Sequence, residues 1–257
     1  GLVLLAANPA ARAALQDEIQ VYLDDIDRPG AAGLELHVNT TPNGNPATGY
    51  PGEVVSRHGL RVTPEFSYGL AAAWEAGLYL PAVIDARGRA DLAGVKLRLK
   101  WLPLPGTGAS QGWFAGANLE LARVPQRYEF SRYGAELRLI AGRRTEAWTF
   151  GVNPVFEWAL AGGARSARPD FSVGLKAARR VADGIALGAE YYADTGQLGR
   201  RLPGSQQDQS VFVAFDVERQ PWIFNFGVGY GLTAVSDRWT VKAIFELPWP
   251  ARPAGAQ

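Results

Sequence analysis

Residues suited to acid–base or nucleophilic chemistry are few, because the 257-residue chain contains only two histidines, His37 and His58. Ser56 lies two positions before His58, so in an extended strand both side chains project from one face. A serine beside a histidine is the pair that a lipid hydrolase or lipid A-modifying enzyme uses as nucleophile and base. No third group that would orient the histidine is evident, so the sequence favours a protein that is not an enzyme. His37 shares the parity of Asn39 and is predicted to be a hydrogen-bonding residue of an inner face.

Composition removes several other chemistries. The chain has no cysteine, which excludes thiolate metal sites, disulfides and cysteine nucleophiles. No ligand cluster has the spacing of a metal site, and the glycines do not form a phosphate-binding loop, so the sequence predicts no metal and no cofactor. Lys and Arg number 26 against 25 Asp and Glu, a net charge of +1 that predicts no nucleic-acid partner.

A second set of candidates consists of charged side chains that recur at alternate positions, together with one small and one amide residue of the same parity. We assign them to the wall of a lumen, where they would set selectivity. They are Arg61, Glu65, Glu75, Lys96, Arg98, Lys100, Glu120, Glu136, Arg138, Lys176, Glu190, Asn225 and Gly229.

Two interpretations of this charged set remain open. Charged side chains along a conduit select solutes, as charged rings do in channels. Alternatively, mutually paired charges simply fill the interior of a closed barrel. Counting along the strands predicts that Glu65 and Arg98 approach each other across Gly77, and that Lys100 neighbours Glu75.

The elements that position these residues are β-strands with two unlike faces, and Trp222–Leu232 shows the pattern most clearly. Large apolar residues share one parity, whereas Asn225, Gly227, Gly229 and Gly231 share the other. Its length suits a membrane-spanning strand of about 9–11 residues. We therefore predict lipid on the aromatic side and lumen on the other, with this strand forming the least obstructed wall, so that Gly229 would lie beside any conduit.

Twelve such segments follow one another from residue 33 to residue 250. They span about 34–40, 59–70, 74–80, 94–102, 113–123, 133–142, 148–160, 171–179, 185–194, 210–217, 222–232 and 239–249. Long connections mostly follow the odd-numbered segments and short turns the even-numbered ones. This alternation over an even strand count predicts an all-β fold, a transmembrane antiparallel up-and-down β-barrel of about 12 strands in the bacterial outer membrane.

The eight tryptophans support this prediction, because all of them fall on the apolar parity. Six lie beside the short turns, and Trp158 and Trp239 lie at the opposite rim. Indole rings prefer the boundary between membrane and water. A soluble sandwich or a lipocalin-like barrel has no reason to band them in this way.

The ends of the chain lie outside the barrel pattern. Residues 1–13 resemble the end of a secretory signal peptide, with Ala11-Arg12-Ala13 as a small-x-small cleavage site. Residues 14–32 are acidic and are predicted to be either a periplasmic extension or a segment that plugs the lumen. Residues 251–257 form a C-terminal tail.

Several segments resemble a family of proteobacterial outer-membrane transporters that are similar to proteins associated with phenol degradation. The resemblance rests on Gly49–Glu53, His58–Phe66, Trp74–Pro81, Lys96–Pro103 and Asp237–Trp239. It implies a barrel in the outer membrane and passage of aromatic or other small organic compounds, but it carries no binding residues to transfer.

The sequence thus predicts an outer-membrane channel for passive uptake of small molecules. The charged inner parity favours polar or charged solutes. A lipid hydrolase using Ser56 and His58, or a structural barrel with a closed lumen, are the alternatives. The expected partners are outer-membrane lipid and lipopolysaccharide and a small-molecule solute, and the barrel is expected to be a monomer.

Overall fold

The computed structural model describes residues 16–107, 111–161, 165 and 167–247. The proposed signal-peptide remnant, the C-terminal tail and Trp249 lie outside the described residues. The strands are β1 (Ala32–Asn43), β2 (Leu60–Ala71), β3 (Trp74–Tyr79), β4 (Ala82–Ile84), β5 (Ala90–Leu92), β6 (Val95–Pro105), β7 (Trp113–Arg123), β8 (Tyr133–Arg144), β9 (Trp148–Ala159), β10 (Asp170–Ala182), β11 (Ile185–Gln197), β12 (Asp208–Arg219), β13 (Trp222–Gly231) and β14 (Trp239–Glu246), with the short 3-10 helix η3 (Gly204–Gln206).

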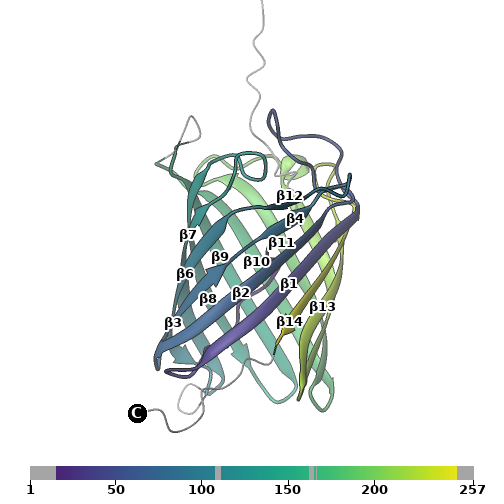
Figure 1. Cartoon of the computed structure of the whole chain (residues 1–257). Helices are drawn as coiled ribbons and strands as arrows, with labels where there is room; N and C mark the ends of the chain where they lie inside the picture. The colour runs from purple at the N-terminus through teal and green to yellow at the C-terminus, as the bar shows by residue number, and fades with distance from the viewer. Residues whose placement is uncertain (1–15, 108–110, 162–164, 166, 248–257) are drawn as a thin grey trace, which may run out of the picture.

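The strands form one closed antiparallel barrel (Figure 1). From β6 to β14 each strand pairs with the next one in the chain, β3 pairs with β2 and β6, and β1 pairs with both β2 and β14, which closes the sheet. β3 and β4 pair in succession with β2 and together occupy one wall position, whereas β5 pairs only with β4. The barrel therefore has twelve strands, which confirms the predicted fold class.

The interruption between β3 and β4 has a local cause. Pro64 lies on β2 opposite the break, and Pro81 lies within it. Proline has no backbone N–H to donate to a sheet ladder, so strands containing it are commonly bulged or interrupted. The sequence predicted a bulge at Pro64, and the structure places the irregularity in the partner strand.

The two ends of the barrel differ, as predicted from the connections. The short turns at 72–73, 145–147, 183–184 and 220–221 share one end, at the bottom of Figure 1, which we call the short-turn end. The connections at 44–59, 124–132, 160–169 and 198–207 share the other, which we call the long-loop end. This arrangement is that of an outer-membrane barrel.

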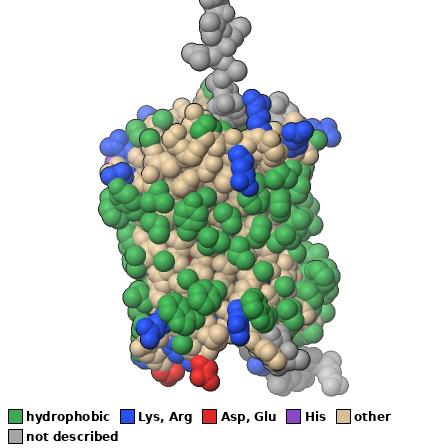
Figure 2. Space-filling view, turned by 180° about the vertical axis from the view of Figure 1, so that it is seen from behind, with side chains coloured by type: hydrophobic (Ala, Val, Ile, Leu, Met, Phe, Trp, Pro, Cys, Tyr) green, Lys and Arg blue, Asp and Glu red, His purple; other side chains and the backbone are tan. Residues whose placement is uncertain are grey.

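The outer surface carries a band of apolar side chains between rims where charged residues gather (Figure 2). Six tryptophans of this face, Trp74, Trp101, Trp113, Trp148, Trp222 and Trp239, are between 40% and 69% exposed. Such exposure of indole rings is expected where lipid covers them. In the described part of the chain, no helix is long and apolar enough to cross a membrane.

Candidate functional site: the lumen and its internal segment

Residues 16–28 run through the barrel interior, and we call them the internal segment. An asparagine of β9 holds its middle: the Tyr22 N–H donates to Asn153 Oδ1 at 2.6 Å, and Asn153 Nδ2 donates to the Tyr22 carbonyl at 3.0 Å. This side-chain amide reproduces the two hydrogen bonds that a neighbouring strand would make. Asn153 and Tyr22 are both at most 3% exposed, so neither bond competes with bulk water.

Side chains from other strands satisfy the backbone carbonyls of the internal segment. Lys242 Nζ of β14 donates to the Ile19 carbonyl at 3.0 Å, and Arg138 Nη1 of β8 donates to the Gln20 carbonyl at 3.1 Å. Asn39 Nδ2 of β1 donates to the Asp17 carbonyl at 3.1 Å. Buried backbone groups must be paired, and in this segment lumen side chains replace a sheet ladder.

The internal segment is anchored again at the short-turn end. The Asp27 N–H donates to Glu75 Oε2, and Ser67 Oγ donates to Asp27 Oδ2, both at 2.6 Å. Arg144 Nε donates to Asp24 Oδ1 at 2.7 Å. The segment therefore crosses the lumen from the long-loop half, where Asp17 lies, to the short-turn end, where it leads into β1.

Three charge clusters surround the internal segment. In the first, Arg98 Nη1 lies 2.7 Å from Glu65 Oε1, and Arg98 Nη2 pairs with Glu75. A Cβ at Gly77 would lie 2.6 Å from Arg98 Nε, so only glycine leaves room for this guanidinium. The predicted approach of Glu65 and Arg98 across Gly77 is thus present in the structure.

Lys100 and Glu75 are neighbours, as the sequence predicts, although no ion pair joins them in the described part of the chain. The two residues are register partners on β3 and β6, but Glu75 binds Arg98 instead. Lys100 Nζ lies 5.2 Å from the centre of the Tyr22 ring. The internal segment brings an aromatic face to this cation, and strand alternation alone could not reveal it.

The second cluster faces the long-loop half. Lys96 Nζ lies 2.8 Å from Asp17 Oδ2 and 3.2 Å from Glu120 Oε1. Arg138 Nε lies 2.9 Å from Glu136 Oε1, with its guanidinium carbon 4.5 Å from the centre of the Tyr22 ring. Five of the predicted wall residues line a cavity here: Arg61, Lys96, Glu120, Glu136 and Arg138.

This cavity has a volume of about 810 Å³. Its lining extends from Asp17, Glu18 and Gln20 of the internal segment to Arg165 and Arg200 of the long-loop connections. The cavity is therefore a vestibule in the long-loop half, bounded on its inner side by the internal segment. A volume of this order is typical of a small-molecule site.

The third cluster lies on the wall formed by β10 to β14. Lys176 Nζ contacts Asp216 Oδ1 at 2.8 Å and Glu190 Oε1 at 3.4 Å. Lys242 Nζ also pairs with Glu190, and Asn225 Nδ2 donates to Asp216 Oδ1 at 2.7 Å. These side chains pair with one another, and none of them lines the vestibule.

The prediction that the strand carrying Gly229 forms the least obstructed wall is wrong. The Phe212 ring, 2% exposed, lies directly over Gly229, and Lys242 lies over Gly227. The glycines of β13 therefore leave space for large side chains of the adjacent strands, and this wall is not the least obstructed one. Phe212 is at an inward-facing position of β12 and is the register partner of Gly229. A bulky aromatic at such a position in the sequence could have predicted that this wall is obstructed.

In the short-turn half of the lumen, an apolar cluster packs between the internal segment and the wall formed by β6 to β8, and the sequence did not predict it. Tyr22, Leu102, Phe114 and Ile140 are each at most 3% exposed and pack together with Leu23 and Ile26. Leu102, Phe114 and Ile140 project inward from β6, β7 and β8. The sequence could have revealed this cluster, because near the short turns apolar residues occupy inward-facing positions that are polar elsewhere in the strands.

The serine and histidine of the hydrolase alternative do not form a catalytic pair. Ser56, 2% exposed, donates its Oγ proton to Asp237 Oδ1 at 2.7 Å, whereas His58 is exposed in a turn at a φ of 58°. Burial raises the pKa of the Asp237 carboxyl, against hydrogen bonds from the Asn45 N–H and Ser56. Their expected common face is wrong, because residues 56–58 are not in a strand.

No protein-family model and no curated protein matches the chain. Solved outer-membrane barrels are similar in structure. The NanC porin has a TM-score of 0.57 at 9% identity, covering 84% of this chain and 100% of that chain. The KdgM porin in complex with disordered oligogalacturonate has a TM-score of 0.56 at 6% identity, covering 85% and 99%. The COG4313 outer membrane channel from Pseudomonas putida F1 has a TM-score of 0.55 at 13% identity, covering 90% and 99%.

At these identities the likeness shows the fold. Together with the apolar outer band, it places the protein among the β-barrels of the bacterial outer membrane, as the sequence predicted. The three similar structures named above are porins or a channel.

Proposed function

We propose that the protein is a passive outer-membrane channel for small polar or charged organic molecules. The vestibule of about 810 Å³ is the observation that carries this proposal. Cations and carboxylates from both the wall and the long-loop connections line it, so that a solute carrying either charge finds a partner there. The resemblance to transporters associated with phenol degradation, and the oligogalacturonate named with the KdgM porin, agree with small organic solutes.

Passage through the lumen requires the internal segment to move. Asp17, Glu18 and Gln20 bound the vestibule, and below them Tyr22, Leu23 and Ile26 pack on the barrel wall. A polar solute cannot cross this apolar cluster without leaving its hydrogen-bond partners, at a cost of several kcal/mol per group. The conducting state that we propose is therefore one in which the segment leaves the apolar wall.

Single-channel recording of the full chain in a planar bilayer tests the proposal, with ion selectivity measured from the reversal potential. We expect small, infrequent openings for the natural sequence and more frequent openings for Tyr22→Ala, which removes the centre of the apolar cluster. Tyr68→Ala is the matched control, because Tyr68 is 46% exposed on the outer face. Absence of openings in all three proteins would favour a closed structural barrel.

We further propose that the outer face contacts membrane lipid and lipopolysaccharide, and that the barrel is a monomer. Support for the lipid contact comes from the arginines paired with aromatic rings at the rims, such as Arg143 over Trp113 at 5.1 Å and Arg238 over Tyr230 at 4.4 Å. Guanidinium groups held in this way can bind lipid phosphates. Mass measurement in detergent, with bound lipid retained, tests both statements.

A further inference from the structure

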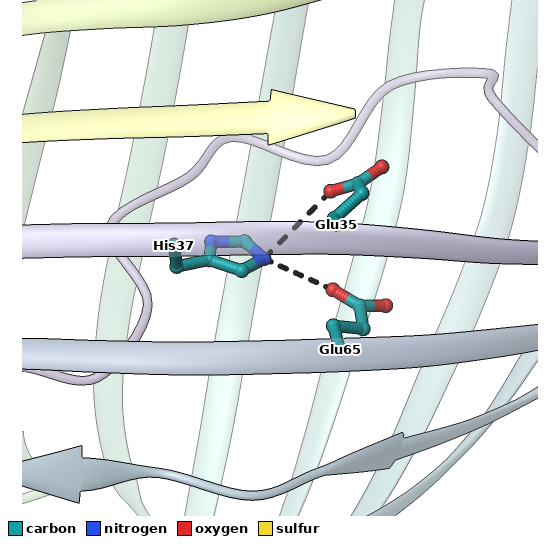
Figure 3. Close-up of side chains that lie close together, drawn as sticks. All are labelled: Glu35, His37 and Glu65. Atoms are coloured by element: carbon teal, nitrogen blue, oxygen red, sulfur yellow. Dashed lines mark hydrogen bonds and ion pairs between the residues drawn. The ribbon is translucent and has the colours of Figure 1, made fainter. Parts of the chain in front are cut away.

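Glu35 and His37 of β1 and Glu65 of β2 form a compact group inside the lumen (Figure 3). Glu35 and His37 are two positions apart, so both face inward, and Glu65 is the register partner of Glu35. Figure 3 shows the His37 ring directed between the two carboxylates, with Nε2 toward both. The vestibule does not include these residues.

The donor atoms are spaced for a metal ion. His37 Nε2 lies 3.1 Å from Glu65 Oε2 and 3.7 Å from Glu35 Oε2, and one donor atom from each residue lies within 4.8 Å of the others. Zinc bonds of about 2.0–2.2 Å to nitrogen and oxygen place neighbouring ligands of a tetrahedral ion about 3.4 Å apart. The observed spacings bracket this value, so an ion would need only small side-chain shifts.

The local charges favour a divalent cation. Arg98 is shared between Glu65, through Oε1, and Glu75, so that one guanidinium serves two carboxylates. Among the described residues, the ion pair of Glu35 is with His37. Arg98 and Lys100 both act electrostatically on Glu35 and Glu65. With His37 neutral, as metal binding requires, the three carboxylates of Glu35, Glu65 and Glu75 still outnumber these two cations, and a bound cation would neutralise the excess negative charge.

The surroundings hold the ligands in place and leave a way in. Arg98 fixes Glu65, and its guanidinium carbon lies 5.7 Å from the centre of the Tyr79 ring. His37 is fully buried, whereas the Glu35 side chain is 36% exposed. In the described structure His37 Nδ1 makes no hydrogen bond, so burial rather than a hydrogen bond holds this ring. Two buried ligands and one partly exposed carboxylate resemble sites in which three protein ligands leave a fourth position open.

We propose that Glu35, His37 and Glu65 bind one divalent transition-metal ion of the zinc or cobalt type, with the fourth position open to water or solute. An imidazole with two carboxylates suits these ions, whereas magnesium and calcium prefer oxygen ligands alone. This site is separate from the vestibule and does not depend on the channel proposal.

The composition of the chain makes the test sharp, because it has no cysteine and only two histidines. Folded protein in detergent is titrated with Co²⁺, followed by visible absorption, and with Zn²⁺, followed by calorimetry. We expect one ion per chain for the natural sequence and for His58→Ala, the matched control in the exposed turn. His37→Gln and Glu35→Gln should each weaken binding at least tenfold.

A gel-mobility shift on heating checks that each variant forms the barrel. If His37→Gln does not fold, metal binding by Glu35→Gln tests the proposal. The Glu35 side chain is partly exposed and glutamine has nearly the same shape, so this variant should still fold. Binding of less than one ion by the natural protein, or binding that survives both lumen substitutions and is lost in His58→Ala, would overturn the proposal.

Discussion

The two halves of the lumen differ in how they hold the same internal segment. In the long-loop half, polar and charged wall residues bind its carbonyls and Asp17, and a vestibule remains beside it. In the short-turn half, Leu102, Phe114 and Ile140 pack on Tyr22. Under the proposed channel function, the charged half would receive a solute and the apolar half would block its passage.

The largest expected effect comes from locking the segment to the wall. A Cβ at Gly151 would lie 3.2 Å from Val21 Cγ1, the position that the sulfur of a cysteine at residue 21 can take, so the two cysteines are within reach of a disulfide. The same Cβ would lie 2.6 Å from Leu23 Cδ2, the end of a flexible side chain that must shift. We expect the oxidised Val21→Cys/Gly151→Cys variant to show no openings in a planar bilayer, and reduction to restore them. The single-cysteine variants, in a chain otherwise free of cysteine, are the controls. Unchanged openings in the oxidised protein would show that the segment does not block the path.

A large effect on stability is expected from Arg98→Met, because it leaves Glu65 and Glu75 buried without their cation. Breaking a buried ion pair in this way costs about 3–5 kcal/mol, measured here by urea unfolding in detergent. Arg138→Met should cost less, since Arg138 borders the vestibule, where water can replace it. Adding Glu65→Gln and Glu75→Gln to Arg98→Met should recover most of the loss, and no recovery would contradict the pairing.

An intermediate effect is expected from Gly229→Ala. The new methyl group would meet the Phe212 ring, so the substitution should lower the free energy of unfolding by about 1–3 kcal/mol, as overpacking of a well-filled interior does. Gly204→Ala, whose methyl group would meet nothing within 4 Å, is the control. Addition of Phe212→Ala should relieve the clash at Gly229. Reduced conductance with an unchanged free energy of unfolding would instead support the sequence prediction that Gly229 lies beside the conduit.

The smallest effect is expected from Ser56→Ala, at the long-loop rim. It removes one hydrogen bond to Asp237, worth about 1 kcal/mol. We expect this small loss in thermal unfolding and no change on His58→Ala, since His58 is exposed. Fatty-acid release from lipid, abolished by either substitution, would revive the hydrolase alternative.

The wall could be predicted from the sequence because a strand with unlike faces repeats every two residues, and neighbouring strands are neighbours in the chain. That periodicity gave the twelve strands and placed Glu65 near Arg98. It could not place the internal segment, which has no periodicity of its own. The contacts of Asn153 with Tyr22 join residues 131 positions apart. The Tyr22 ring beside Lys100 depends on such a contact, so alternation alone could not reveal it. Phe212 is the register partner of Gly229 on the adjacent strand, so the parity of Phe212 could have placed its ring there.

The internal segment leads directly into β1, the strand that pairs with β14 and closes the barrel. Lys242 of β14 also holds the Ile19 carbonyl, 223 positions away. The final seam of the barrel and the attachment of the segment therefore form between the same two parts of the chain. Contacts so distant in sequence form slowly during folding. A kinetic consequence is that insertion of the segment and sealing of the barrel should share one rate-limiting step, so that substitutions at Lys242 would delay both together.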